Sequence, residues 1–166
     1  MSDDIKREYP DLGLDADAVE GITHIFKTLL ADEYVLYTKL RHFHWNVTGP
    51  QFRSLHQLFE EQYTALETTI DQTAERLRSY GPYAPGTMAQ FLEMTRLQEQ
   101  GGVPTAQEMV QELAADHEHM VRLLRDDIDN ADDYDDDGAE DFLTGLLQAH
   151  QEQAWMLRTF LQGAAF

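Results

Sequence analysis

One predicted helix, over residues 52–80, carries a histidine and four carboxylates on a single face. With about 100° per residue, Glu60, Glu67, Asp71 and Glu75 all fall within roughly 100° of His56 around the helix axis. The apolar stripe of the same helix is separate from this face. Imidazole and carboxylate groups together suit iron or zinc. The spacing therefore predicts a metal site, and the alternative is a face that is only solvated.

One chain cannot gather this set around a single metal ion. His56 and Glu75 are about 28 Å apart along a helix, whereas a metal–ligand bond is about 2 Å long. A second copy of the helix, antiparallel about a two-fold axis, brings His56 opposite Glu75 of the partner subunit and Glu60 opposite Asp71 of the partner subunit. His44, at the end of the preceding helix, can approach the same region. We therefore predict two equivalent metal sites at one dimer interface.

Four long helices are expected to position these residues, because apolar side chains recur at steps of three, four and seven. They are predicted over residues 17–47, 52–80, from 105 onward, and 139–162. Gly49-Pro50 ends the first of them, and a short helical piece is predicted over residues 88–95. The predicted fold class is all-α: one domain over residues 1–166, folded as a four-helix bundle with a short extra helix between the second and third long helices. A short acidic tail precedes it, over residues 1–16.

Charge and composition restrict the possible partners. Acidic residues number 31 against 12 basic ones, for a net charge of −19. Such a surface repels nucleic acid and anionic lipid and attracts cations. It is typical of a halophile with a salt-rich cytoplasm, and the alternative is an ordinary acidic soluble protein. The absence of cysteine excludes disulfides, thiolate sites and iron–sulfur clusters. No apolar run reaches the roughly 20 residues of a membrane span, and no signal peptide is predicted, so a cytoplasmic location is expected.

The stretch HWNVTGPQFRSLHQLFEEQY, followed by DQTAERL, resembles the signature of the Dps family, the miniferritins named as DNA-binding proteins from starved cells. The matching positions are His44-Trp45, Gly49, Phe52, His56, a carboxylate at Glu60, Asp71 and Ala74-Glu75-Arg76. The resemblance extends over essentially the whole chain, including the four-helix plan and the ending QAWMLRTFL. It implies a ferritin-like fold and a dodecameric hollow shell built from two-fold dimers.

The same resemblance implies an activity. Fe²⁺ would be oxidised by hydrogen peroxide at di-iron centres between subunits, and Fe³⁺ mineral would be stored inside the shell, which protects against oxidative damage. Asp71 and Glu75 are the implied ligands from one subunit, and the other subunit supplies His44, His56 and Glu60. The family usually has aspartate where this chain has Glu60, so the longer side chain is expected to alter how the weaker iron is held. Trp45 is implied to lie beside the centre and to absorb oxidising equivalents.

A second candidate site is the segment 126–137, in which eight of twelve residues are aspartate. By resemblance, Asp132, Asp137 and Asp141 line a three-fold pore that admits iron, since rings of carboxylates concentrate cations. One alternative is a solvated turn. Another is a calcium loop beginning at Asp133, although its twelfth position is Thr144 rather than the glutamate that such loops need.

Three other classes of protein fit the sequence less well. Ferritins and bacterioferritins build a di-iron centre within one bundle from Glu-x-x-His motifs, and no histidine here has a glutamate three residues before it. His117 and His150 are expected to be core residues. A DNA-compacting nucleoid protein is the alternative function, but the N-terminal tail and the net charge argue against direct DNA binding unless salt or bridging cations screen the repulsion. A purely structural helical assembly leaves the clustered ligands unexplained.

Overall fold

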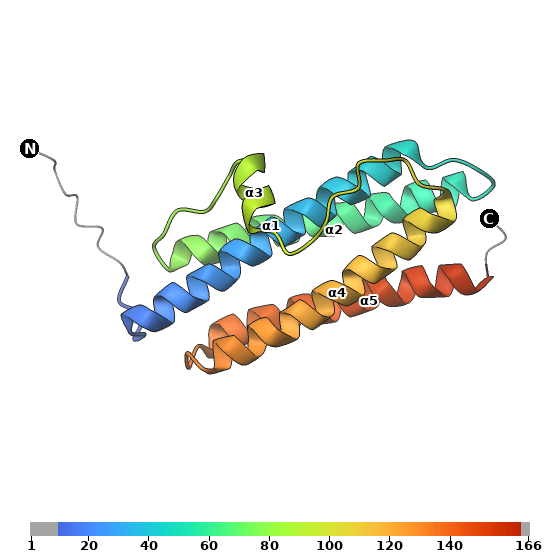
Figure 1. Ribbon diagram of the computed structural model, residues 1–166. Coiled ribbons are helices and arrows are strands. Elements are labelled where there is room, and N and C mark those ends of the chain that lie inside the picture. The colour runs from blue at the N-terminus through green and yellow to red at the C-terminus, as the bar shows by residue number, and fades with distance from the viewer. Residues whose placement is uncertain (1–9, 164–166) are drawn as a thin grey trace, which may run out of the picture.

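The computed structural model describes residues 10–163, and that part of the chain contains five helices and no strand. They are α1 (Ala16–Asn46), α2 (Phe52–Ser79), α3 (Met88–Met94), α4 (Ala106–Asp132) and α5 (Asp137–Gly163). Figure 1 shows α1 and α2 as one antiparallel pair and α4 and α5 as a second pair, which together form a four-helix bundle. The short α3 lies against α1 on the outer side of the bundle. The predicted helices, including the short one, are confirmed.

Local chemistry fixes where the helices begin. The side chain of Asp15 accepts a hydrogen bond from the amide of Ala18 at 2.8 Å and so caps the N-terminus of α1. Thr105 and Glu108 form a capping box at the start of α4, in which each side chain binds the other's backbone amide. The sequence had indicated this pair, and its geometry is confirmed.

The core is apolar and lies between the two helix pairs. Phe26, Phe43 and Phe59 are fully buried there, together with leucines from all four long helices. Phe52, which the apolar periodicity placed on the buried stripe of α2, is instead 46% exposed and packs its ring against His56 at 5.1 Å. The reason is its position as the first residue of α2, where the helix has just begun beyond the edge of the core.

The long connection between α3 and α4 is held to the bundle by buried ion pairs. Arg96 donates to Asp32 of α1 at 2.8 Å and to both carboxylate oxygens of Asp127 of α4 at 2.9 and 2.8 Å. Burial raises the pKa of both carboxyl groups, and the guanidinium opposes that shift. Lys39 of α1 similarly binds Asp116 of α4 at 2.7 Å. These contacts fix the two helix pairs relative to one another.

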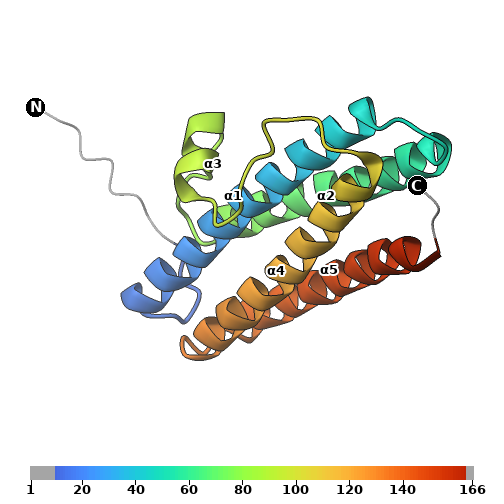
Figure 2. The ribbon, with the colours of Figure 1, turned by 45° about the vertical axis from the view of Figure 1, so that its right-hand side comes forward.

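The two ends of the bundle carry different groups of residues, as Figure 2 makes clear. One end holds the connection between α1 and α2, close to His44 and His56. The other end holds the start of α1, the end of α2 and the aspartate-rich turn between α4 and α5. Among the described helices, none combines the length and the apolar character that crossing a membrane requires.

Candidate metal centre

His44 and His56 are locked together by a reciprocal pair of hydrogen bonds. Nδ1 of His44 lies 2.8 Å from the backbone oxygen of His56, and Nδ1 of His56 lies 2.8 Å from the backbone oxygen of His44. The rings stack with centroids 3.7 Å apart. A carbonyl oxygen can only accept, so each Nδ1 carries a proton and Nε2 is the ring nitrogen left to bind a metal ion. This is the arrangement in which an imidazole binds a metal and a backbone carbonyl orients it.

Aromatic side chains surround this histidine pair. The ring of Tyr63 meets His44 edge-on at 5.2 Å. The guanidinium carbon of Arg41 lies 4.6 Å from the ring centroid of Tyr63 and 5.2 Å from that of Trp45. It also lies 5.6 Å from the ring centroid of Tyr37, and Arg41 donates a hydrogen bond to the hydroxyl oxygen of Tyr37 at 2.9 Å. Trp45 therefore connects to the histidine pair through Arg41 and Tyr63.

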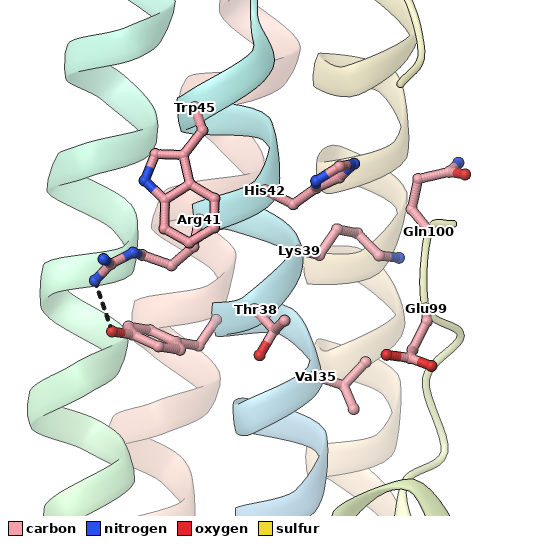
Figure 3. Close-up of a pocket in the computed structure, with 9 residues that line it drawn as sticks. Val35, Thr38, Lys39, Arg41, His42, Trp45, Glu99 and Gln100 are labelled. Carbon is pink, nitrogen blue, oxygen red and sulfur yellow. Dashed lines mark hydrogen bonds between the residues drawn. The ribbon is translucent and has the colours of Figure 1, made fainter. Parts of the chain in front are cut away.

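Figure 3 shows how these residues are divided between two sides of α1. Arg41 and Trp45 point toward α2, while His42 and Lys39 point toward α4 and the segment that contains Glu99. His42 lies 2.8 Å from the backbone oxygen of Gly102, so it holds the α3–α4 connection against α1. Trp45 remains 64% exposed on the chain's own surface. The candidate centre and the α3–α4 connection thus occupy opposite sides of the same helix.

The predicted carboxylate ligands lie on the exposed face of α2. Glu60 is one turn beyond His56, and its carboxylate lies at 3.5 Å from the hydroxyl of Tyr63. Partial desolvation and then the charge of Glu60 raise the pKa of Tyr63. Asp71 and Glu75 are exposed and follow one another by one turn near the far end of the helix.

The chain by itself brings only part of the predicted set together. His56 and Glu60 lie near the start of α2, with His44 of α1 beside His56, whereas Asp71 and Glu75 are several turns away. Within residues 10–163, no three histidine or carboxylate side chains gather closely enough to hold a metal ion. The division of the ligands between two subunits stays a prediction.

The bundle centre holds a different group of ionisable residues. Nε2 of His150 lies 3.0 Å from Oε1 of Glu33, and Nδ1 of His150 lies 2.9 Å from Nδ1 of His117. All three side chains are buried. Burial, and then the charge of His150, lower the pKa of His117 well below its usual value. The three groups form a line through both nitrogens of His150 and do not converge on a point, so their arrangement is that of a hydrogen-bonded chain rather than a ligand cage.

The aspartate-rich turn joins α4 to α5. Asp132 ends α4, Asp137 begins α5, and Asp141 follows one turn later, all three exposed. Partial desolvation and the neighbouring charges of Asp132 and Asp137 raise the pKa of Glu140, which lies among them. The calcium-loop alternative is wrong, because residues 137–144 are already helical and cannot form the second half of such a loop.

Several residues around these sites were not predicted from the sequence. The apolar periodicity places Tyr63 only on the buried stripe of α2, and the predicted ligand set does not include Arg41. A cation four residues before Trp45 on one helix face was the available signal for Arg41. Glu33 gave no signal at all, since a single glutamate in an apolar helix does not reveal its buried partner. His117 and His150 are core residues as predicted.

Comparison with known proteins identifies the family. The model for the ferritin-like domain matches residues 24–165. A curated relative, DNA protection during starvation protein 2 of Bacillus anthracis, is 40% identical over 140 residues, covering 84% of this chain and 96% of its own. The chain belongs to the Dps family of ferritin-like proteins. A low temperature-induced protein of Nostoc sp., itself uncharacterised, is 47% identical over 155 residues, which cover 92% of this chain and 87% of that protein.

Solved structures agree with the Dps assignment. The Dps protein of Vibrio cholerae O1, described as a member of a broad superfamily of ferritin-like diiron-carboxylate proteins, superposes with a TM-score of 0.87 at 26% identity. The match covers 92% of this chain and 96% of the Vibrio chain. The ferritin-like bundle of this Dps chain, with its short extra helix, is therefore the fold of its family, as the sequence predicted.

Proposed function

We propose that this chain oxidises Fe(II) and stores the ferric product, at di-iron centres formed between two copies of itself. The observation that carries the proposal is the reciprocal lock of His44 and His56, which leaves Nε2 of each ring to bind metal, with Glu60 one turn beyond His56 on α2. Imidazole nitrogen and carboxylate oxygen are donors that suit iron. Asp71 and Glu75, exposed on the same helix, would complete each centre when supplied by the partner subunit.

The proposed reaction is a two-electron oxidation. Two Fe(II) ions each give one electron to hydrogen peroxide, which takes up two protons and becomes two molecules of water. Because both electrons are delivered together, no hydroxyl radical is released. The residues of this chain would hold the two ions close, and Trp45 is proposed to absorb stray oxidising equivalents beside the centre.

The proposed assembly is a hollow dodecamer built from two-fold dimers. Large apolar side chains remain on the surface of the single chain, including Trp45 at 64% exposure and Trp155 at 58%. Burial of such side chains between subunits is the usual driving force for assembly. The acidic surface suits a salt-rich cytoplasm, where the repulsion among subunits with a net charge of −19 is screened.

A crystal of the assembled protein soaked in ferrous iron tests the proposal. We expect anomalous scattering at the iron edge within about 2 Å of Nε2 of His56 and of the carboxylate of Glu75 of the partner subunit. Light scattering in solution should give a mass of twelve times 19.1 kDa. Iron bound only by residues of a single subunit, or a monomer in solution, would contradict the proposed centre.

Iron is proposed to reach the interior through three-fold pores lined by Asp132, Asp137 and Asp141. Replacing all three by asparagine should slow Fe(II) uptake by roughly tenfold at low ionic strength, because the field that concentrates cations is lost. The difference from the parental protein should shrink as salt rises. Uptake is followed by stopped-flow absorbance across a salt series. Parental rates at every salt concentration would show that these residues are only a solvated turn.

DNA compaction is the other function to weigh, because the Bacillus relative is named for DNA protection. A net charge of −19 opposes contact with the phosphate backbone, and counterion release can favour binding only where basic residues replace the counterions. No observation on the described residues favours a DNA-binding face, so iron oxidation and storage is the proposed function.

A further inference from the structure

The aspartate-rich turn is held from the end of α2 by one buried hydroxyl group. Tyr80 is 3% exposed, and its ring packs against Phe26 of α1 at 5.8 Å. Its hydroxyl donates to Oδ2 of Asp136 at 2.5 Å. Burial and this carboxylate raise the pKa of Tyr80 to about 12, so the hydroxyl keeps its proton at any physiological pH. A core residue at the C-terminal cap of α2 is thereby bonded directly to the turn between α4 and α5.

Asp136 uses its other carboxylate oxygen to begin α5. Oδ1 accepts from the amide of Ala139 at 2.9 Å, which is the geometry of a helix N-cap. The residue that Tyr80 binds is therefore the residue that sets where α5 starts. Asp137 comes directly after this cap, and Asp141 lies one turn further along the same helix.

Arg76 supports the same turn from α2. Its guanidinium carbon lies 5.9 Å from the ring centroid of Tyr80. A Cβ atom built on Gly138 would lie 2.5 Å from Nη2 of Arg76, so the guanidinium rests directly against this backbone. Only glycine leaves room for the arginine in its present position. The guanidinium also places a positive charge beside a turn that is otherwise strongly acidic.

The far side of the turn is fixed to α1. The ring of Tyr134 lies on the backbone of Gly21, where an added Cβ would meet ring atoms at 2.1 to 2.3 Å. The backbone closes the turn with hydrogen bonds from Tyr134 to Ala131 at 3.1 Å and from Asp135 to Asp132 at 2.9 Å. Asp135 has a positive φ of 55°, a conformation that aspartate tolerates better than most residues. The aspartates of this turn are thus held in place by the fold.

We propose that Tyr80 is a positioning residue for iron uptake, which fixes the carboxylates of Asp137 and Asp141 by bonding to the cap of α5. The inference rests on the proposed pore. A carboxylate ring concentrates cations only when its members stay close to the pore axis, because the field of charges spread over several positions is weaker at any one of them. Tyr80 never touches the iron in this proposal and acts through Asp136 alone.

Tyr80→Phe tests the inference, since it removes the hydroxyl and keeps the ring in the core. We expect assembled shells whose Fe(II) uptake at low ionic strength is about threefold slower, with a shallower dependence of rate on salt. Oxidation at saturating Fe(II) should match the parental rate, because the proposed centre lies elsewhere. Asp136→Ser keeps a capping side chain but cannot reach Tyr80, so it should reproduce the defect. Combining both changes should add nothing further, because each breaks the same bond.

Tyr34→Phe is the matched control, because it removes a hydroxyl from a half-buried tyrosine of α1 that stacks on Phe91 of α3, and its uptake should be parental. A merely structural role for Tyr80 predicts a lower melting temperature with an unchanged salt dependence, and that result would overturn the inference. The variant with Asp132, Asp137 and Asp141 replaced by asparagine separates the proposed pore from the proposed role of Tyr80. If it is slow while Tyr80→Phe is parental, the pore stands and the inference fails. If it too is parental, both fail.

Discussion

A variant carrying Asp71→Asn and Glu75→Gln should assemble normally but oxidise Fe(II) with peroxide about 100-fold more slowly than the parental protein. Both residues are exposed, so replacing them with isosteric amides should not disturb the bundle. Each is proposed as a ligand, and an amide oxygen is a far weaker ligand for iron than a carboxylate. Stopped-flow absorbance after rapid mixing of Fe(II)-loaded protein with peroxide gives the rate.

The matched control carries the same two changes of residue type at exposed positions outside the proposed centre. Asp126→Asn combined with Glu152→Gln alters the net charge by the same amount, on α4 and α5. If the control is slowed as much as the test variant, the effect is one of overall charge. Parental kinetics in a correctly assembled Asp71→Asn, Glu75→Gln shell would remove these residues from the centre.

The second large effect is expected in the bundle centre, on stability rather than on activity. His150→Leu removes the group that bridges Glu33 and His117, and leaves the fully buried carboxyl group of Glu33 without a partner. An unpartnered buried acid costs about 3 kcal/mol, or more where it stays charged. Urea unfolding followed by circular dichroism should therefore show a loss of about 3 kcal/mol in the free energy of unfolding.

Removing both partners should be milder than removing one. In Glu33→Leu combined with His150→Leu no buried acid is left alone, so a good part of the lost stability should return. His119→Leu is the control, because this half-buried histidine lies on α4 outside the chain of three. A double variant at least as unstable as the sum of the two single variants would mean that the pair has no mutual interaction.

Most of the fold could be predicted from periodicity and local chemistry. The steps of three and four in α1 and α2 reproduce their bounds to within a residue, and Thr105 with Glu108 marks the start of α4. Phe52 is the exception. Periodicity indicates the face of a helix on which a residue lies. It does not indicate where along α2 the core begins, because that depends on how α2 packs against its neighbours.

The candidate site was predictable only in part. Residue type and spacing indicate His56, Glu60, Asp71 and Glu75, because a helix has fixed geometry. The stacking of His44 on His56 depends on the path of the connection between α1 and α2, which spacing does not determine. Glu33 and Tyr80 were beyond prediction for a related reason. Their partners lie 117 and 56 residues away, and only the packed bundle brings them together.

The placement of the histidine pair at the end of α1 has an electrostatic consequence. His44 is in the last turn of α1, a helix of 31 residues. The carbonyl groups of this last turn accept no hydrogen bond from an amide of the same helix. The peptide dipoles of α1 sum to about half a negative charge at this end. The dipole of α1 therefore favours a cation beside His44, whereas the positive N-terminal end of α2 near His56 opposes it, so the carboxylates must supply most of the attraction for a divalent ion.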